Sequence, residues 1–325
     1  MNRLLKVLSK VVGYGVLALA AIAVLALAYV FLFYPRSAPA SPRPLERTPA
    51  RLARGAYLVG HVALCLDCHS ERDWRQYSAP VERGTAGRGA LVTFFGRPTW
   101  SANITPAGLG DWTDGEVVRG ITAGVKKDGA PVNPQMSYDT YSQLSEEDVA
   151  SIVVYLRTLS PIQHPQPPNH TGLVMGVMQR FLPTPWKPQP APPTSDAVAT
   201  GRYLVNVAEC DVCHRPNLAG GKSFTIPGGS GATVVSTNLT PDPETGIGRL
   251  RVEAFVGLFK AFAGGVRGAG GPGTRAAQTV MPWSRYAGMQ EEDLVAIYDY
   301  LRTLKPVKND VQSRAQPPAR AAGGL

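Results

Sequence analysis

The longest apolar run in the sequence extends from Val11 to Phe33 and contains no charged residue. As a helix rising about 1.5 Å per residue, it would be about 35 Å long, enough to cross a hydrocarbon core of roughly 30 Å. A cleaved signal peptide normally has an apolar region of only about 7–15 residues, so the length favours an uncleaved helix. Residues 1–36 are therefore predicted to form an N-terminal membrane anchor.

Shorter patterns predict helices in the rest of the chain. Thr48-Pro49 is typical of a helix start, and a similar start occurs near Ser195-Asp196. After the potential cap Ser145, apolar residues recur at the three- and four-residue spacing of one buried helix face. Further helices are expected at residues 114–121, 173–182 and 251–262 and from about Gln290, and small hairpins around residues 91–95 and 233–235. The chain is therefore predicted to be mostly α-helical.

Three segments of the first half return in the second half, which indicates an internal repeat. The matching pairs are Gly55–Val59 with Gly201–Val205, Ser101–Pro106 with Ser236–Pro241, and Tyr155–Leu159 with Tyr300–Leu304. Two domains are therefore expected, at residues 48–160 and 195–305. The proline-rich residues 161–194 between them read as a stiff spacer whose short apolar helix packs against one or both domains. Residues 306–325 have no periodicity and are expected to be a loose tail.

All four cysteines lie in two short motifs, Cys65-Leu66-Asp67-Cys68-His69 and Cys210-Asp211-Val212-Cys213-His214. C-x-x-C-H is the attachment signature of haem c: the two thiols form thioethers with the macrocycle, and the histidine ligates its iron. A redox-active cysteine pair would need a βαβ context that is missing, and a zinc site would leave both adjacent histidines unexplained. Two covalently bound haem groups are expected, attached by Cys65, Cys68, Cys210 and Cys213 and ligated by His69 and His214.

Met136 and Met281 are the candidates for the sixth iron ligand. Each follows the histidine of its motif by 67 residues, although the loops within the two units differ in length. A methionine opposite histidine raises the haem potential and suits electron transfer. Met289 is the rival in the second unit, and ligation by a second histidine, His164 or His170, stays open. Packing or surface roles are expected for His61, Met175 and Met178.

With these residues in view, both units resemble class I cytochrome c domains, which are all-α. More narrowly, they resemble the domains of the multihaem cytochrome subunits of membrane-bound bacterial alcohol and gluconate dehydrogenases. The resemblance covers about residues 50–305. It departs from the family in having two haem domains instead of three, and in Met136-Ser137-Tyr138 and Met281-Pro282-Trp283 where the family favours Met-Pro-Tyr. It implies two tandem domains joined by a Pro-rich linker and preceded by one transmembrane helix.

The function predicted from these features is a relay of single electrons, with no catalytic residues. The alternative is a dihaem enzyme, but a peroxidase needs an open axial position, and a thiosulfate-oxidising centre needs a fifth cysteine. A structural subunit in which haem is incidental explains two complete motifs poorly. The net charge of +9 is not accompanied by a basic run with interleaved aromatic residues, so nucleic-acid binding is not expected.

Covalent haem attachment takes place at the outer face of the bacterial cytoplasmic membrane. A single-pass protein is therefore expected, with its N-terminus inside, residues 11–33 in the lipid bilayer and both haem domains in the periplasm. The expected partner is a membrane-bound or periplasmic redox complex: a dehydrogenase, a quinol-oxidising complex, an oxidase or a reaction centre.

Overall fold

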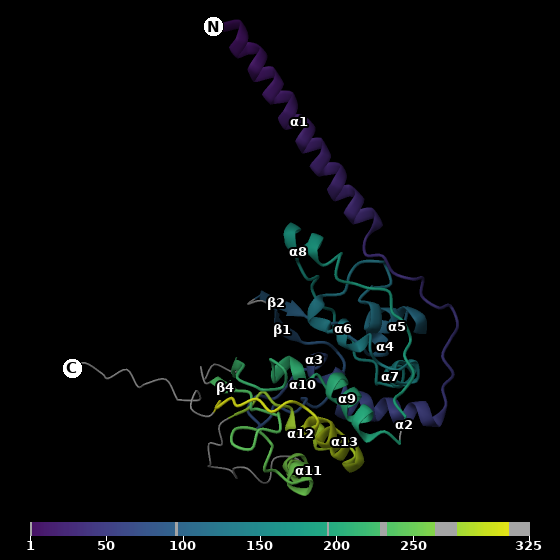
Figure 1. Cartoon of the computed structure of the whole chain (residues 1–325). Coiled ribbons are helices and arrows are strands. Elements are labelled where there is room, and N and C mark those ends of the chain that lie inside the picture. The colour runs from purple at the N-terminus through teal and green to yellow at the C-terminus, as the bar shows by residue number, and fades with distance from the viewer. Residues whose placement is uncertain (1, 95–96, 194, 228–232, 264–277, 312–325) are drawn as a thin grey trace, which may run out of the picture.

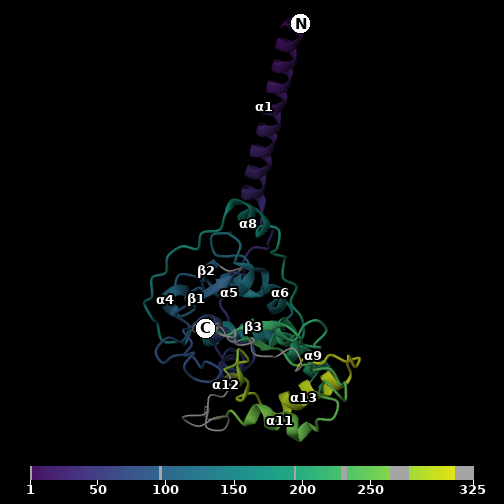
Figure 2. The ribbon, with the colours of Figure 1, turned by 90° about the vertical axis from the view of Figure 1, so that its left-hand side faces the viewer.

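The computed structural model describes residues 2–94, 97–193, 195–227, 233–263 and 278–311, and these residues are mostly helical (Figure 1). One long helix, α1 (Asn2–Phe33), extends away from a body that contains the other elements, as both ribbon views show (Figures 1 and 2). Thr194 of the expected spacer and residues 312–325 of the expected tail lie outside the described residues.

Helix α1 is long and apolar enough to cross a membrane. Its segment Leu5–Phe33 has a mean hydropathy of 2.8, and none of it is buried against the rest of the protein. The helix begins before the predicted Val11, because Lys6 and Lys10 are good helix formers and do not interrupt it. Apart from its last turns, which contact the segment around α8 (Leu173–Met178), this helix is therefore exposed along its length.

In the first unit, α2 (Pro49–Tyr57) packs against α7 (Glu146–Leu156). The predicted caps are confirmed: the Thr48 hydroxyl accepts a hydrogen bond from the Arg51 backbone, and Ser145 caps α7 in the same way. A Cβ atom at Gly55 would overlap the backbone carbonyl of Ser151. The two helices therefore cross too closely for any side chain at residue 55.

In the second unit, α9 (Ala197–Val207) packs against α13 (Glu291–Arg302) in the same way. Gly201 stands where Gly55 stands in the first unit, and a Cβ atom there would overlap the Ala296 carbonyl. The Asp196 side chain caps α9, whereas Gln290 provides no side-chain cap for α13, as expected from the sequence. The sequence repeat thus corresponds to a repeated helix pair.

Short elements complete both units. Two antiparallel hairpins occur where they were predicted, β1 with β2 and β3 with β4, paired at Val92 with Thr99 and at Phe224 with Val234. The elements of the first unit are the π-helix η1 (Leu58–Val62), α3 (Cys65–Cys68), β1 (Leu91–Phe94), β2 (Arg97–Trp100), α4 (Pro106–Leu109), α5 (Asp114–Ala123), the 3-10 helix η2 (Pro134–Met136) and α6 (Tyr138–Tyr141). Those of the second are α10 (Cys210–Cys213), β3 (Ser223–Thr225), β4 (Thr233–Val235), α11 (Val252–Lys260) and α12 (Trp283–Tyr286).

The two units are joined by a reciprocal pair of contacts. The Tyr57 hydroxyl donates to Asp293 at 2.5 Å, and the Tyr203 hydroxyl donates to Asp148 at 2.6 Å. Each hydroxyl also accepts from the backbone N–H of the residue that caps the partner helix, Gln290 or Ser145. Each unit therefore gives the tyrosine of its first helix to the last helix of the other, so the units meet in an approximately two-fold arrangement.

The linker helix α8 (Leu173–Met178) forms within the predicted residues 173–182 but ends four residues earlier, in a turn. It contacts the end of α1, and Met178 is exposed rather than packed. Other parts of the linker do bind the first unit. The Asn169 side chain forms two hydrogen bonds with the Trp100 backbone, and Trp186 packs against the core. The linker is therefore docked on both sides of α8 while α8 itself stays outside the body.

Candidate haem-binding sites

Both C-x-x-C-H motifs have the same backbone geometry. In each, one helical turn, α3 or α10, follows a residue in the left-handed region, Leu64 with φ 52° or Glu209 with φ 54°. The two cysteines lie three residues apart on this turn and therefore share one face. The histidine follows directly, with its backbone N–H bonded to the carbonyl of the first cysteine. Each motif thus presents two sulfur atoms and one imidazole together.

The imidazole rings are oriented by backbone carbonyls. Nδ1 of His69 lies 2.7 Å from the carbonyl oxygen of Ala102, and Nδ1 of His214 lies 2.8 Å from that of Thr237. Because a carbonyl only accepts, Nδ1 must carry the proton, which leaves a free electron pair on Nε2. Burial lowers the pKa of both histidines and favours the neutral ring. This tautomer and orientation are those of a metal-ligating histidine.

The repeated Asn-Ile/Leu-Thr-Pro segment supports these carbonyls. Asn103 and Asn238 directly follow the carbonyl that binds each ring, and each donates from Nδ2 to a later backbone carbonyl, at Ile162 or at Val307. Each asparagine also accepts from the threonine two residues on, through both its N–H and its hydroxyl. The repeated segment therefore fixes the carbonyl that orients the histidine ring, a role that the sequence did not indicate.

Two tyrosines hold the methionine segments beside the motifs. Tyr141 follows Met136 by five residues, and its hydroxyl donates to the Ala63 carbonyl at 2.8 Å. Tyr286 follows Met281 by five residues and donates to the Ala208 carbonyl at 2.7 Å. Both carbonyls lie just before the first cysteine of a motif. These tyrosines were not predicted as part of the site, although each follows the candidate methionine of its unit by the same number of residues.

In the second unit, the motif opens onto a cavity of about 990 Å³. Its lining combines the groups that a haem c needs with aromatic side chains: Cys210, Cys213, His214, Met281, Phe255, Phe259, Trp283 and Tyr286. Met289 also lines it and is 1% exposed, whereas Met281 is only partly buried. The structure therefore brings both methionine candidates to the site of His214.

A contact from the first unit reaches the Met281 segment. The Ser78 hydroxyl donates to the Met281 carbonyl at 2.8 Å, and the Ser78 N–H donates to the Gln278 side chain, also at 2.8 Å. The loop of Ser78 follows the first motif in sequence. The position of Met281 thus depends on a loop of the other unit, which no local sequence pattern indicated.

In the first unit, Met136 ends η2 and is partly buried against the core. The rival His164 lies edge-on against Trp100, with 5.7 Å between the ring centroids, and His170 is exposed. Nδ1 of His61 lies 2.9 Å from the Arg285 carbonyl of the second unit. His61 therefore has the packing role expected for it, in a contact between units.

The environment of the thiols bears on the alternative of a redox-active pair. Burial raises the pKa of Cys65 to about 12 and that of Cys210 to about 12. A reactive dithiol requires the opposite shift, towards the thiolate. Within the part of the chain that the structure describes, no three His, Cys, Asp or Glu side chains gather as a metal site would require. The arrangement thus favours covalent haem attachment over the dithiol and zinc alternatives.

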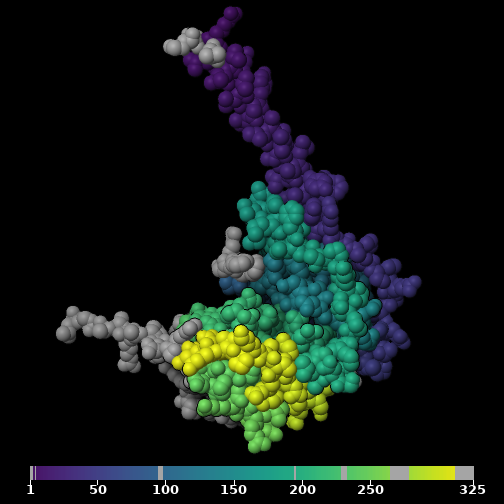
Figure 3. All heavy atoms as spheres, viewed as in Figure 1, coloured from purple at the N-terminus to yellow at the C-terminus, as the bar shows by residue number. Residues whose placement is uncertain are grey.

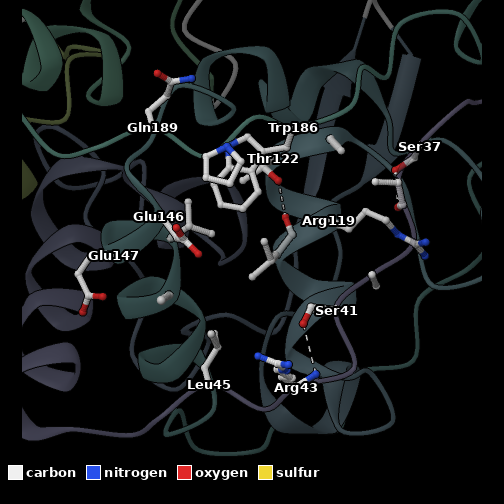
Figure 4. A pocket seen from close by; sticks show the side chains of 18 of the residues that line it. Ser37, Ser41, Arg43, Leu45, Arg119, Thr122, Glu146, Glu147, Trp186 and Gln189 are labelled. Atoms are coloured by element: carbon white, nitrogen blue, oxygen red, sulfur yellow. Dashed lines mark hydrogen bonds between the residues drawn. The ribbon is translucent and has the colours of Figure 1, made fainter.

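A second cavity, of about 660 Å³, lies away from both motifs (Figure 4). Residues 37–45 after α1, helices α5 and α7, and the linker around Trp186 line it, and the motifs contribute no side chain to it. Nearby, the Leu45 N–H donates to Asp114, and Gly115 leaves room for the backbone of Ser41. The segment that follows α1 is therefore packed into the first unit.

Comparison with known proteins places this geometry in a family context, although no family model matches the chain. The fructose dehydrogenase cytochrome subunit of Gluconobacter japonicus is 29% identical over 83% of this chain and 56% of its own length. The cytochrome c subunit of a quinone-type alcohol dehydrogenase from Gluconacetobacter polyoxogenes is 30% identical over 81% of this chain and 58% of its own length.

The chain is a homologue of bacterial dehydrogenase cytochrome c subunits. It spans just over half the length of the fructose and alcohol dehydrogenase subunits. A further relative, a diheme cytochrome c-type protein of Cereibacter sphaeroides, is 26% identical over 57% of this chain and 73% of its own length. The resemblance inferred from the motifs is thereby confirmed.

Proposed function

We propose that this protein is a membrane-anchored dihaem cytochrome c that relays single electrons as a subunit of a dehydrogenase complex. The observation that carries the proposal is the duplicated motif geometry: two cysteines on one helical turn and a histidine whose Nδ1 is bonded to a carbonyl, present in both units. Two covalent haem groups follow from two such sites. The dihaem relative supports this number.

Each side chain of the site has a role in this proposal. Cys65, Cys68, Cys210 and Cys213 form the thioether bonds, and His69 and His214 ligate iron through Nε2. Met136 and Met281 fill the sixth positions, supported by the tyrosines that hold their segments beside the motifs. Bound haem supplies a one-electron ferric–ferrous couple. In this proposal one histidine and one methionine of each unit would hold the iron of its haem between them.

The proposed domain boundaries follow the repeat. Residues 48–160 and 195–305 form two tandem class I cytochrome c domains, and residues 161–194 form the linker. The expectation of a loose tail from residue 306 is wrong for its described part, because Val307 and Asn309 hydrogen-bond to the second unit and Val311 is buried. The matching helix pairs α2 with α7 and α9 with α13 support this division. The Tyr57–Asp293 and Tyr203–Asp148 bonds then keep the two haem sites in a constant relation, as serial electron transfer requires.

Helix α1 is the proposed membrane anchor, with its N-terminus on the cytoplasmic side. Basic residues flank the apolar segment on both sides, with Arg3, Lys6 and Lys10 before it and Arg36 and Arg43 after it, so the haem motifs and not the charges decide this orientation. Aromatic Tyr29 and Tyr34 lie where the segment ends, as is typical of an interface. The haem units then stand in the periplasm, where haem c is attached.

A membrane-bound dehydrogenase is the proposed electron donor, because the relatives are named as cytochrome subunits of dehydrogenases and α1 is the proposed anchor. The test is gentle solubilisation of membranes followed by affinity purification of this chain. We expect a dehydrogenase to co-purify and the α-band absorption of haem c to increase when its substrate is added. A chain that purifies with no dehydrogenase, or whose haem stays oxidised with the enzyme and substrate present, would argue for another donor.

A further inference from the structure

An apolar surface patch lies on α8 and the turn that follows it. Five large apolar side chains are exposed there: Leu173 62%, Val174 74%, Met178 55%, Phe181 52% and Leu182 48%. Val174, Met178 and Phe181 recur at the three- and four-residue spacing of one helix face. Contiguous exposed apolar side chains of this kind mark an interaction surface.

The patch is attached to the end of α1. The Arg180 guanidinium donates to the Tyr34 carbonyl at 2.6 Å and lies 4.3 Å from the centre of the Phe31 ring. The rings of Tyr34 and Phe181 lie 4.8 Å apart. In both ribbon views α8 is at the side of the body that faces α1, and the space-filling view shows it beside the last turn of that helix (Figures 1, 2 and 3).

These contacts set the depth of α8 if α1 crosses a bilayer. An apolar span that begins after Lys10 reaches the opposite interface near Phe33, because about 20 residues cross the hydrocarbon core. Phe31 and Tyr34, which Arg180 and Phe181 contact, then lie at that interface. The exposed side chains of α8 consequently lie at the level where acyl chains meet headgroups.

We propose that α8 and the following turn dip into the outer interfacial layer of the bilayer and form a second membrane contact of this chain. This inference rests on the proposed membrane anchor. The charge of the segment favours contact with a membrane surface. Residues 161–194 contain Arg180 and Lys187 and no acidic residue, so no carboxylate of this segment repels anionic lipid headgroups. Apolar side chains with flanking basic groups are typical of interfacial helices.

The second contact has a consequence for electron transfer. A chain that contacts the bilayer only through α1 has a single attachment point, which leaves the tilt of the whole chain relative to the membrane plane undetermined. Insertion of α8 adds an attachment point far away in sequence and fixes one face of the first unit towards the membrane. The linker is thus an orienting element as well as a spacer.

The test uses the full haem-loaded chain in vesicles of phosphatidylethanolamine and phosphatidylglycerol. Val174→Cys is labelled with a nitroxide, and the matched control is Val295→Cys on α13, an exposed valine (36%) on a helix at the end of the body away from α1 (Figures 1 and 2). Because the native cysteines are thioethers in the haem-loaded chain, the label reacts only with the new cysteine. We expect the residue 174 label to collide preferentially with oxygen, which concentrates in lipid, and the residue 295 label with a water-soluble nickel chelate.

Three outcomes would overturn the inference. A residue 174 label as accessible to the nickel chelate as the control would place α8 in water. A label shielded from both reagents would show that protein covers the patch.

Alkaline carbonate extraction of the same vesicles examines α1 separately. Release of the chain would refute the anchor together with this inference, whereas a retained chain with a water-exposed label would refute only the contact of α8.

Discussion

At the scale of single residues, the site is built from pairs that the sequence shows only in part. The cysteines, the histidines and the methionines at equal spacing were predicted as haem-binding residues from the sequence alone. The bonds from Tyr141 and Tyr286 to the carbonyls of Ala63 and Ala208 were not, because their acceptors are backbone atoms without a sequence signature. A sequence repeat thus indicates which residues belong to the site, but it does not indicate which atoms those residues contact.

The methionine assignment gives a prediction for the second unit. Met281→Leu should remove about half of the sulfur–iron charge-transfer absorption of the ferric protein and lower the potential of one haem, because leucine provides no thioether. Optical spectra and a potentiometric titration measure both effects.

Met289→Leu is the matched control, since Met289 lines the same cavity and is 1% exposed. It conserves volume, so it should cost less than about 1.5 kcal/mol of stability and leave the absorption intact. Loss of the band in this variant, with the band kept in Met281→Leu, would transfer the ligand role to Met289.

At the scale of helices, periodic patterns predicted the elements well, and their packing partners less well. The caps at Thr48, Ser145 and Asp196 have the expected geometry, because capping depends on neighbouring residues only. The apolar linker helix formed as predicted but lies against α1. The apolar composition of α8 indicates that other apolar groups cover it. The composition does not indicate whether those groups belong to α1, to a haem unit or to another molecule.

The close crossing of α2 and α7 gives a stability prediction. Gly55→Ala should destabilise the fold by about 1–3 kcal/mol, because the added methyl group overlaps the Ser151 carbonyl and forces the helices apart. Gly257→Ala in α11 is the control: nothing lies within 4 Å of its Cβ position, so it should stabilise by about 0.5–1 kcal/mol. Denaturant unfolding of both haem-loaded variants measures the difference, and equal effects would refute the close crossing.

The contact between the units gives a pH prediction. Burial raises the pKa of Tyr203, so the folded protein retains this proton at a pH where the unfolded chain, near the ordinary value of about 10, loses it. The associated stability is complete below about pH 10 and decreases as the pH rises above it.

Tyr203→Phe should therefore cost about 1–3 kcal/mol at pH 7, because the Ser145 N–H loses its acceptor and Asp148 keeps only its bonds to Arg54 and to its helix cap, and should make the alkaline decrease shallower. Unfolding midpoints between about pH 8 and pH 11 measure both effects. A variant with the wild-type alkaline slope would contradict the buried position of this hydroxyl.

At the scale of the whole molecule, the architecture separates three tasks. Helix α1 is the proposed membrane anchor, the two units present their motifs, and the tyrosine–aspartate bonds join the units reciprocally. The repeat predicted that two similar units exist, but their mutual arrangement depends on tyrosine side chains whose aspartate partners lie 236 and 55 residues away in the sequence. That arrangement makes a serial relay of electrons physically reasonable.

The most direct test of the central claim is the number of electrons that the purified chain accepts. An anaerobic titration with a calibrated reductant, followed at the haem absorption bands, should consume two electrons per chain in one-electron steps, with haem that acidified acetone does not extract. Uptake of a single electron, or haem that is extracted, would contradict the account.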